Sequence, residues 1–357
     1  MSGIATLGNR LYRGEVSYDI VGRKRLWYII SGVVLAISIV TLGTRGLNLG
    51  IEFKGGAEFT VPVKNASTTS VSQAREAVKA VNVEASNVTI VGGDKVRIQT
   101  QTVTTNVSEA IGTSLASKFG VSVNDIKVQL VGPSWGSEVS KNAAKALLVF
   151  LILVALFLSL YFEWPMALAG LVALTHDVLI TVGIYALSGF EVTPATVIGF
   201  LTILGYSLYD TVVVFDKVKE NTKNITAGSR MTYSEASNLA LNQTLVRSIN
   251  TSIVALLPVL SILVVGVVLL GAGTLNDLAL ALFVGMLVGT YSSIFIATPI
   301  LAYIKERSSE MQSLAKRVAA RREKAGIDGV EIITPTASLV TPAGPRRQRV
   351  KRPRSSR

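Results

Sequence analysis

The sequence contains no cysteine and only one histidine, His176. The absence of cysteine excludes disulfide bonds, thiolate metal sites and cysteine nucleophiles. A metal site built from several histidines is excluded as well, and a Ser-His-Asp triad would need this single histidine, which lies inside an apolar segment. We therefore predict no metal site and no cofactor.

Charged residues are almost absent from six long segments. About 20 apolar residues cross a bilayer as a helix, and with 49% hydrophobic residues and a mean hydropathy of +0.48 the chain is typical of an integral membrane protein. We therefore predict a polytopic α-helical membrane protein with six transmembrane helices. The expected spans are 26–44, 146–162, 164–190, 192–215, 248–276 and 278–304.

Lysine and arginine collect on one side of these helices. Residues 1–25 hold five, residues 217–247 hold five and residues 305–357 hold fourteen. The positive-inside rule makes that side cytoplasmic. We therefore expect a cytoplasmic lead-in at 1–25, a cytoplasmic loop at 217–247 and a basic cytoplasmic tail at 305–357, for which anionic lipid or ribosomal RNA is a candidate ligand.

Residues 45–141, between the first two spans, are expected to form an exported domain. Its apolar periodicity and its glycines predict the order strand, helix, strand, strand, helix, strand. This order is typical of the ferredoxin-like α+β fold. The domain shows no catalytic pattern, so we expect it to have a binding or coupling role. The predicted elements are 57–63, 70–81, 88–91, 96–102, 106–119 and 126–131.

Glycine marks two kinds of position. Gly50, Gly55 and Gly56 lie just outside the first span, where paired glycines allow positive φ angles and a close approach of chains. Gly285 and Gly289 are spaced as in the Gly-x-x-x-Gly motif that lets two membrane helices pack tightly.

Asp210 is the residue that most needs an explanation. It lies near the end of the fourth apolar segment, and an ionised Asp at the centre of a spanning helix costs about 2.5 to 3.5 kcal/mol, so it normally faces protein, a partner or a water path. A functional role is the first hypothesis. The alternative is that Asp210 lies at the membrane interface and is simply solvated.

Three further ionisable residues border the same membrane region. For Asp177 in the third segment, proton handling and a structural hydrogen bond between helices both fit, whereas His176 fits the structural role better. Asp177 and Asp210 are expected at similar depths, where they could share one polar seam. Arg247, before the fifth span, could extend to the lipid headgroups or turn inward toward Asp210.

Five motifs, taken together and in their order along the chain, resemble those of the SecF family of bacterial Sec translocase subunits, in the resistance-nodulation-division superfamily. The resemblance covers about residues 18 to 305. Its motifs include five glycines, Gly50, Gly55, Gly56, Gly205 and Gly289. Two positions depart from the family pattern: Glu52 stands where the family usually has Asp, and Tyr209 stands where Asn is common. The motifs are GIEFKGG (50–56), THD (175–177), GYSLYDTVVVFD (205–216), LNQTLVRS (241–248) and VGTYSS (288–293).

The resemblance implies a non-enzymatic subunit of the bacterial plasma membrane with both termini in the cytoplasm. Such a subunit pairs with SecD and uses the proton gradient to help preproteins through the SecYEG channel. The family's polar membrane pair corresponds to Asp210 and Arg247. Two rival functions remain, a small-molecule proton antiporter half of the same superfamily and a scaffold that carries no protons.

Overall fold

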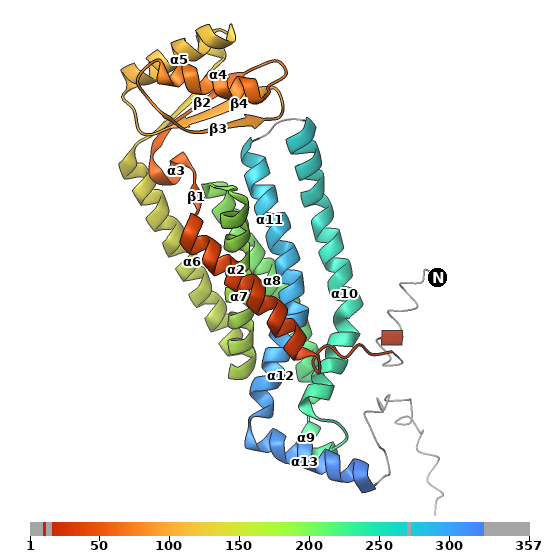
Figure 1. Cartoon of the computed structure of the whole chain (residues 1–357). Coiled ribbons are helices and arrows are strands. Elements are labelled where there is room, and N and C mark those ends of the chain that lie inside the picture. Colours follow the sequence, from red (N-terminus) through yellow and green to blue (C-terminus); the bar gives the residue numbers. More distant parts are fainter. Residues whose placement is uncertain (1–9, 12–15, 270–272, 325–357) are drawn as a thin grey trace, which may run out of the picture.

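The computed structural model describes residues 10–11, 16–269 and 273–324. Its described part contains six helices long and apolar enough to cross a membrane, so the protein is a polytopic helical membrane protein (Figure 1). The expectations for most of the lead-in and for the tail beyond residue 324 lie outside the described residues. The six spans are Lys24–Arg45, Pro133–Tyr161, Trp164–Ser188, Pro194–Gly228, Tyr233–Val265 and Asp277–Glu306.

The helical bundle is built from a set of long helices, two of which continue into π-helical turns. The π-helical segment η3 precedes Pro299, whose ring nitrogen cannot donate the backbone hydrogen bond that a regular α-helix needs there. The bundle elements are α2 (Lys24–Arg45), α6 (Pro133–Tyr161), α7 (Trp164–Ser188), α8 (Pro194–Thr222), α9 (Ile225–Gly228), α10 (Tyr233–Ser261), η2 (Ile262–Leu269), α11 (Gly273–Ser292), η3 (Ser293–Ala297), α12 (Thr298–Glu306) and α13 (Ser309–Lys324).

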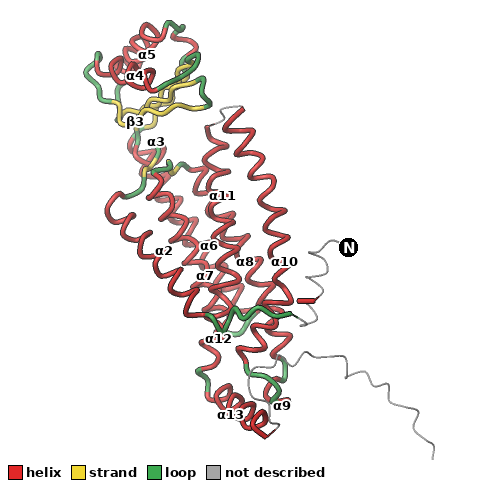
Figure 2. The backbone as a smooth tube through the Cα atoms, turned by 45° about the vertical axis from the view of Figure 1, so that its right-hand side comes forward, coloured by secondary structure: helices red, strands yellow, loops and turns green. Residues whose placement is uncertain are grey.

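Helix α7 lies at the centre of the bundle. In its most apolar stretch 56% of the residues are buried, against 11% for α6 and 17% for α2. It therefore packs against protein, whereas α2 and α6 present apolar side chains outward. α9 and α13 lie at the end of the bundle opposite the small domain, with α13 running across it (Figures 1 and 2).

The segment between the first two spans forms a separate small domain with its own core. Its four strands form an antiparallel sheet in the order β3-β4-β2-β5, and α4 and α5 lie on the face turned away from the bundle (Figure 1). The order of elements along the chain is the predicted one. They are β2 (Gly56–Pro62), α4 (Thr68–Lys79), β3 (Ala85–Val91), β4 (Lys95–Thr100), α5 (Thr105–Phe119), η1 (Val123–Asp125) and β5 (Lys127–Val131).

The domain core follows from the alternation of side chains along the strands. Ala57, Phe59 and Val61 of β2 are each fully buried, and they pack with Val78 of α4 and Leu115 of α5. Residues at every second position of a strand lie on one face of the sheet, so this face collects the apolar side chains under the helices. Gly120, in the left-handed conformation, ends α5 as its position predicts.

The domain is joined to the bundle by two short connections. On one side, β1 (Asn48–Leu49) pairs in parallel with β6 (Glu191–Val192), and the short helix α3 (Ile51–Lys54) follows. On the other side, only Gly132 separates β5 from α6. The stretch 51–54, between Gly50 and Gly55, is a single helical turn.

The largest differences from the sequence prediction are at three boundaries. α6 begins at Pro133, well before its apolar stretch, because proline at the first helical turn favours initiation. α8 continues to Thr222. The second half of the expected cytoplasmic loop is helical and continuous with the fifth span, and the two form the single helix α10, which starts at the capping box of Thr232 and Glu235.

Candidate functional site

Asp210 is buried within the bundle. Its side chain is 4% exposed, and its Oδ2 atom has no hydrogen-bond partner among the described residues. The helix α8 brings it there because Ser207, Asp210 and Val214 recur at helical spacing on the buried face. The alternative of a solvated Asp210 is therefore not what the structure shows, whereas Asp216, less than two turns further on, is exposed.

The hydroxyl groups of two serines face the Asp210 carboxylate. Ser248 comes from α10 and Ser293 from the π-helical segment η3. Both side chains are buried, and the Ser293 hydroxyl donates a hydrogen bond to the carbonyl oxygen of Gly289 at 2.7 Å. Ser248 Oγ makes no hydrogen bond within the described part of the chain. The carboxylate thus sits in a small polar site at the meeting of three helices.

Arg247 lies on α10 next to Ser248 but points outward. Its side chain is exposed, and the described residues show no ion pair between Arg247 and Asp210. Arg247 nevertheless lies close enough for its charge to act on that carboxylate. Within the described structure the guanidinium is thus exposed and not paired with Asp210.

Asp177, by contrast, is buried and hydrogen-bonded. The hydroxyl of Ser207 donates to Asp177 Oδ2 at 2.5 Å, and His176 Nδ1 lies 3.2 Å from Asp177 Oδ1. Ser207 stands one helical turn before Asp210 on α8, so the two acids flank one serine. The expected polar seam between α7 and α8 runs through this serine, a role that sequence reasoning did not assign.

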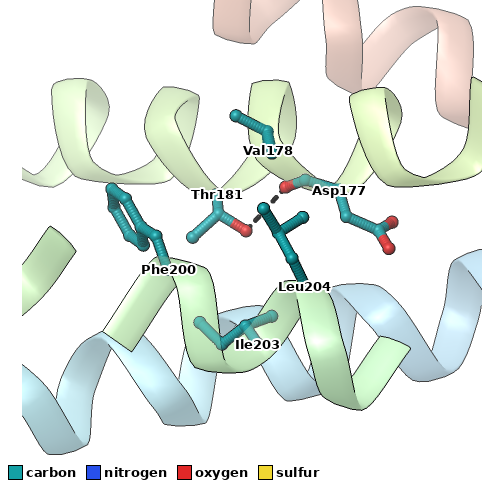
Figure 3. A pocket seen from close by; sticks show the side chains of 6 residues that line it. All are labelled: Asp177, Val178, Thr181, Phe200, Ile203 and Leu204. Carbon is teal, nitrogen blue, oxygen red and sulfur yellow. Dashed lines mark hydrogen bonds between the residues drawn. The ribbon is translucent and has the colours of Figure 1, made fainter. Parts of the chain in front are cut away.

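A small, largely apolar pocket lies beside this seam (Figure 3). Thr181 donates to the backbone carbonyl of Asp177 at 2.7 Å, and the Asp177 carboxylate points away from the Phe200 side of the pocket (Figure 3). Phe200, Ile203 and Leu204 of α8 line the opposite wall. The pocket is therefore apolar on the α8 side, and Asp177 accepts its hydrogen bond from Ser207 outside this lining.

A second set of hydroxyls links α8, α10 and α11. Tyr206 donates to Ser252 Oγ at 3.2 Å, and Thr290 donates to the same oxygen at 2.8 Å. The signal that could have identified these residues is their spacing: Ser248 and Ser252 stand one turn apart on one face of α10. Hydroxyl groups of this kind join membrane helices by hydrogen bonds.

Glycines allow α11 to approach α8 closely. A Cβ atom on Gly289 would lie 2.9 Å from Ser207 Cβ, and one on Gly285 would lie 2.2 Å from Ile203 Cδ1. The Gly-x-x-x-Gly spacing thus corresponds to a real close contact, and it holds α11 against the serine that binds Asp177. Gly205 is different, because nothing in the described structure lies within 4 Å of a Cβ placed there.

The paired glycines outside the first span have steric reasons. Gly55 has a φ of +78°, and a Cβ on it would lie 3.0 Å from Pro133 Cα at the start of α6. A Cβ on Gly56 would lie 2.5 Å from the carbonyl oxygen of Thr100. A Cβ on Gly50 would lie 2.6 Å from Glu52 Oε2. Gly55 therefore allows the close approach of α6 and Gly56 that of β4, whereas the contact at Gly50 is only with the end of a flexible side chain.

Charged side chains meet where the domain rests on the bundle. Glu191 of β6 accepts hydrogen bonds from Arg97 at 2.9 Å and from Gln99 at 2.6 Å, both on β4. Glu52 Oε2 lies buried nearby without a hydrogen-bond partner among the described residues. Burial, together with the negative charges of Glu191 and Glu58, raises the pKa of Glu52 above its ordinary value.

The described residues contain no group of three His, Cys, Asp or Glu side chains that could hold a metal ion. Their chemistry is that of carboxylates and hydroxyls inside a helical bundle. An arrangement of this kind can hold or pass a proton, or it can join helices.

Two models of known protein families match the chain. Residues 110–307 match the model of the protein export membrane protein SecD/SecF, C-terminal, and residues 40–67 match the SecD/SecF GG motif. The first match contains Asp177, Asp210 and Arg247, and the second contains Gly50, Gly55 and Gly56.

Relatives and solved structures agree with these matches. The chain is 52% identical to the protein translocase subunit SecF of Streptomyces coelicolor over 92% of this chain and 88% of the relative. It is 43% identical to that of Mycobacterium tuberculosis over 90% of this chain and 75% of the relative. The crystal structure of SecDF, a translocon-associated membrane protein from Thermus thermophilus, superimposes with a TM-score of 0.72 at 30% identity.

That superposition covers 82% of this chain but 39% of the SecDF chain, so this protein spans about two fifths of SecDF. The family model covers more than half of the chain, and identity to the translocase subunits extends over nearly all of it. On these grounds the chain belongs to the SecF family of protein translocase subunits.

Proposed function

We propose that this protein pairs with a SecD-like subunit and uses the proton gradient to promote late steps of preprotein export through SecYEG. The observation that carries the proposal is the buried carboxylate of Asp210, whose Oδ2 lacks a hydrogen-bond partner in the described structure while the cation of Arg247 stands exposed on the neighbouring helix α10. A carboxyl group in such a place is normally functional.

The mechanism couples proton occupancy of Asp210 to the position of α10. When Arg247 turns toward Asp210, its charge favours the carboxylate and a proton leaves; when Arg247 turns away, a proton returns. Ser248, next to Arg247, accompanies any rotation of α10 and changes the hydroxyl contacts of the carboxylate. One charge crossing 100 mV supplies about 2.3 kcal/mol, which biases a conformational equilibrium.

Asp177 has a supporting part in this proposal. Its two oxygens are engaged by His176 and Ser207, so it holds α8 in register with α7 and can relay a change at Asp210 through the shared turn of α8. These hydrogen bonds favour a positioning role for Asp177 over a proton-carrying one, and they are also what the scaffold alternative would use.

The small domain is proposed to be an exported ferredoxin-like domain. Its element order and its antiparallel strand order β3-β4-β2-β5 support that fold. The excess of lysine and arginine in 217–247 and in the C-terminal stretch supports an orientation with both termini in the cytoplasm of a bacterial cell, and with it an exported position of the domain.

A SecD-like partner is supported by the SecDF structure, because its chain is more than twice as long as the part that this protein matches. The SecD-like partner would lie against exposed apolar helices such as α10, beside Arg247. The translocating preprotein and the SecYEG channel enter the proposal through the family alone.

The test is preprotein export into inverted membrane vesicles, with and without an imposed proton gradient. Asp210→Asn keeps the size of the side chain but removes its titratable proton, so gradient-dependent stimulation should be lost while co-purification with the SecD-like partner persists. Asp216→Asn makes the same chemical change at an exposed position of α8 and should leave stimulation intact. Full stimulation of Asp210→Asn would favour the scaffold.

A further inference from the structure

Strand β5 forms one edge of the sheet in the small domain. It pairs with β2 alone, and within the described residues no backbone hydrogen bond joins its outer edge to another segment. A row of free backbone donors and acceptors is a template on which another extended chain can pair.

The apolar face of β5 is uncovered. Val128 and Leu130 stand opposite Phe59 and Ala57 of β2, which are fully buried, so all four lie on the face that carries the helices. Yet Val128 is 47% and Leu130 46% exposed, because α4 lies against β3 and β4 and α5 lies against β2. The helical layer stops short of the last strand.

The opposite edge of the sheet is protected and β5 is not. The pairing of β3 with β4 contains an irregularity between Ala85 and Asn87, and bulges of this kind blunt an edge against pairing with other chains. The pairing of β5 with β2 runs without interruption, and its only charged residue, Lys127, stands at its start. β5 therefore lacks the features that usually prevent strand addition.

We propose that the free edge of β5 binds an extended polypeptide segment by strand addition, with alternate apolar side chains of that segment over Val128 and Leu130. The uncovered apolar patch is small, whereas a stable interface between folded domains buries about 1,200 to 2,000 Å². An extended segment needs less area because it gains main-chain hydrogen bonds along the strand. The proposed function supplies only the natural occupant, an unfolded exported chain.

A chain bound at this edge would act directly on the bundle. β5 ends at Val131 and α6 begins at Pro133. The start of α6 is held tightly, since a Cβ on Gly136 would lie 2.7 Å from the carbonyl oxygen of Phe53 in α3. Movement of β5 is thereby passed to α6 without a flexible linker.

The test uses the full-length protein in nanodiscs of zwitterionic lipid and no proton gradient. The probe is a short fluorescein-labelled peptide of alternating valine and threonine with a lysine at each end, and its binding is followed by fluorescence anisotropy. A second peptide replaces each threonine by proline, which removes backbone donors. The first peptide should bind at least about tenfold more tightly than the second.

Two variants locate the site. Val128→Glu introduces a charge on the uncovered face and should weaken binding at least about tenfold. Ile90→Glu makes a comparable change at an exposed position of β3 and should leave binding unchanged. Equal binding to both variants, or equal binding of the two peptides, would overturn the proposal.

A photo-crosslinking experiment covers the case in which Val128→Glu misfolds. A benzophenone side chain at Gln129, on the exposed polar face of β5, should crosslink the valine-threonine peptide, whereas one at Thr89 of β3 should not. Crosslinking at Thr89 alone would contradict the site. Asp210→Asn should bind the peptide normally, so a failure of proton coupling and a failure of strand addition give different results.

Discussion

The hydroxyl of Ser207 donates a 2.5 Å hydrogen bond to Asp177 Oδ2, one helical turn before Asp210. This contact joins α7 to α8 in the buried centre of the bundle. Because Gly289 of α11 packs against the same serine, three helices meet at one side chain. Ser207 should therefore matter for stability although it carries no charge.

Replacing Ser207 by alanine should lower stability by about 1 to 3 kcal/mol, because Asp177 Oδ2 would lose its partner while remaining buried. The measurement is thermal unfolding of the purified protein in detergent. Thr202→Ala is the control, since that threonine is exposed and bonds only to the carbonyl of Ile198 in its own helix. Equal melting temperatures for Ser207→Ala and Thr202→Ala would contradict the structural role.

Two glycines of the family motifs should respond in opposite ways to alanine. Gly289→Ala places a Cβ 2.9 Å from Ser207 Cβ and should cost about 1 to 3 kcal/mol through overpacking. Gly205→Ala meets nothing within 4 Å and should be neutral or stabilise the helix by up to about 1 kcal/mol. The same unfolding assay compares them, and a destabilised Gly205→Ala with an unaffected Gly289→Ala would refute the packing of α11 on α8.

The raised pKa of Glu52 predicts a pH dependence at the junction of domain and bundle. A carboxyl group whose pKa is higher in the folded than in the unfolded protein holds its proton more firmly when folded. Its contribution to stability is therefore present at low pH and is lost as the pH rises from the unfolded pKa through the folded one.

Glu52→Gln should accordingly raise the melting temperature at pH 7 and reduce its fall between acidic and neutral pH. Glu84→Gln, an exposed site in the same domain, should change neither. If Glu52→Gln melts at a lower temperature than the natural protein at pH 7, the glutamate is stabilised in its charged form and the assignment is wrong.

The small domain should fold by itself. Its strands and helices close a core that includes Phe59, Val78, Ile98 and Leu115, all fully buried. Residues 45–141 expressed alone should give a circular dichroism spectrum of mixed helix and sheet with a cooperative thermal transition. A random-coil spectrum in native buffer would contradict both the fold and the boundaries expected from the sequence.

Much of this architecture is visible in the sequence because it depends on local patterns. Apolar runs of membrane length mark the six spans, and alternation with glycine punctuation marks the strands and helices of the small domain. The sequence also predicts that Asp210 faces protein or water, since an acid in a long apolar segment must find one or the other.

The contacts between helices could not be predicted in this way. Whether Ser207 meets Asp177, and whether Arg247 faces Asp210 or solvent, depends on the rotation of each helix about its own axis, which the apolar runs leave undetermined when they surround the helix. The single helix α10 could not be predicted either, because its polar first half resembles a cytoplasmic loop and only its apolar second half resembles a span.

Removing the charge of Arg247 tests whether Asp210 depends on it for gradient-dependent export. Arg247→Met keeps an unbranched side chain but removes the charge, and we expect it to abolish gradient-dependent export while assembly persists. If the two residues act as a unit, the double variant with Asp210→Asn should be no worse than either single one. Stimulation that persists in Arg247→Met but is lost in Asp210→Asn would show that Asp210 acts without Arg247.

The central claim, that Asp210 exchanges the proton that drives export, is tested most directly by proton entry into liposomes. The subunit and its SecD-like partner would be reconstituted with a pH-sensitive dye inside, and a proton gradient would be imposed in the presence of a translocating preprotein. The account predicts acidification with the natural protein and with Asp216→Asn, and none above the protein-free background with Asp210→Asn. Acidification at the natural rate with Asp210→Asn would contradict it.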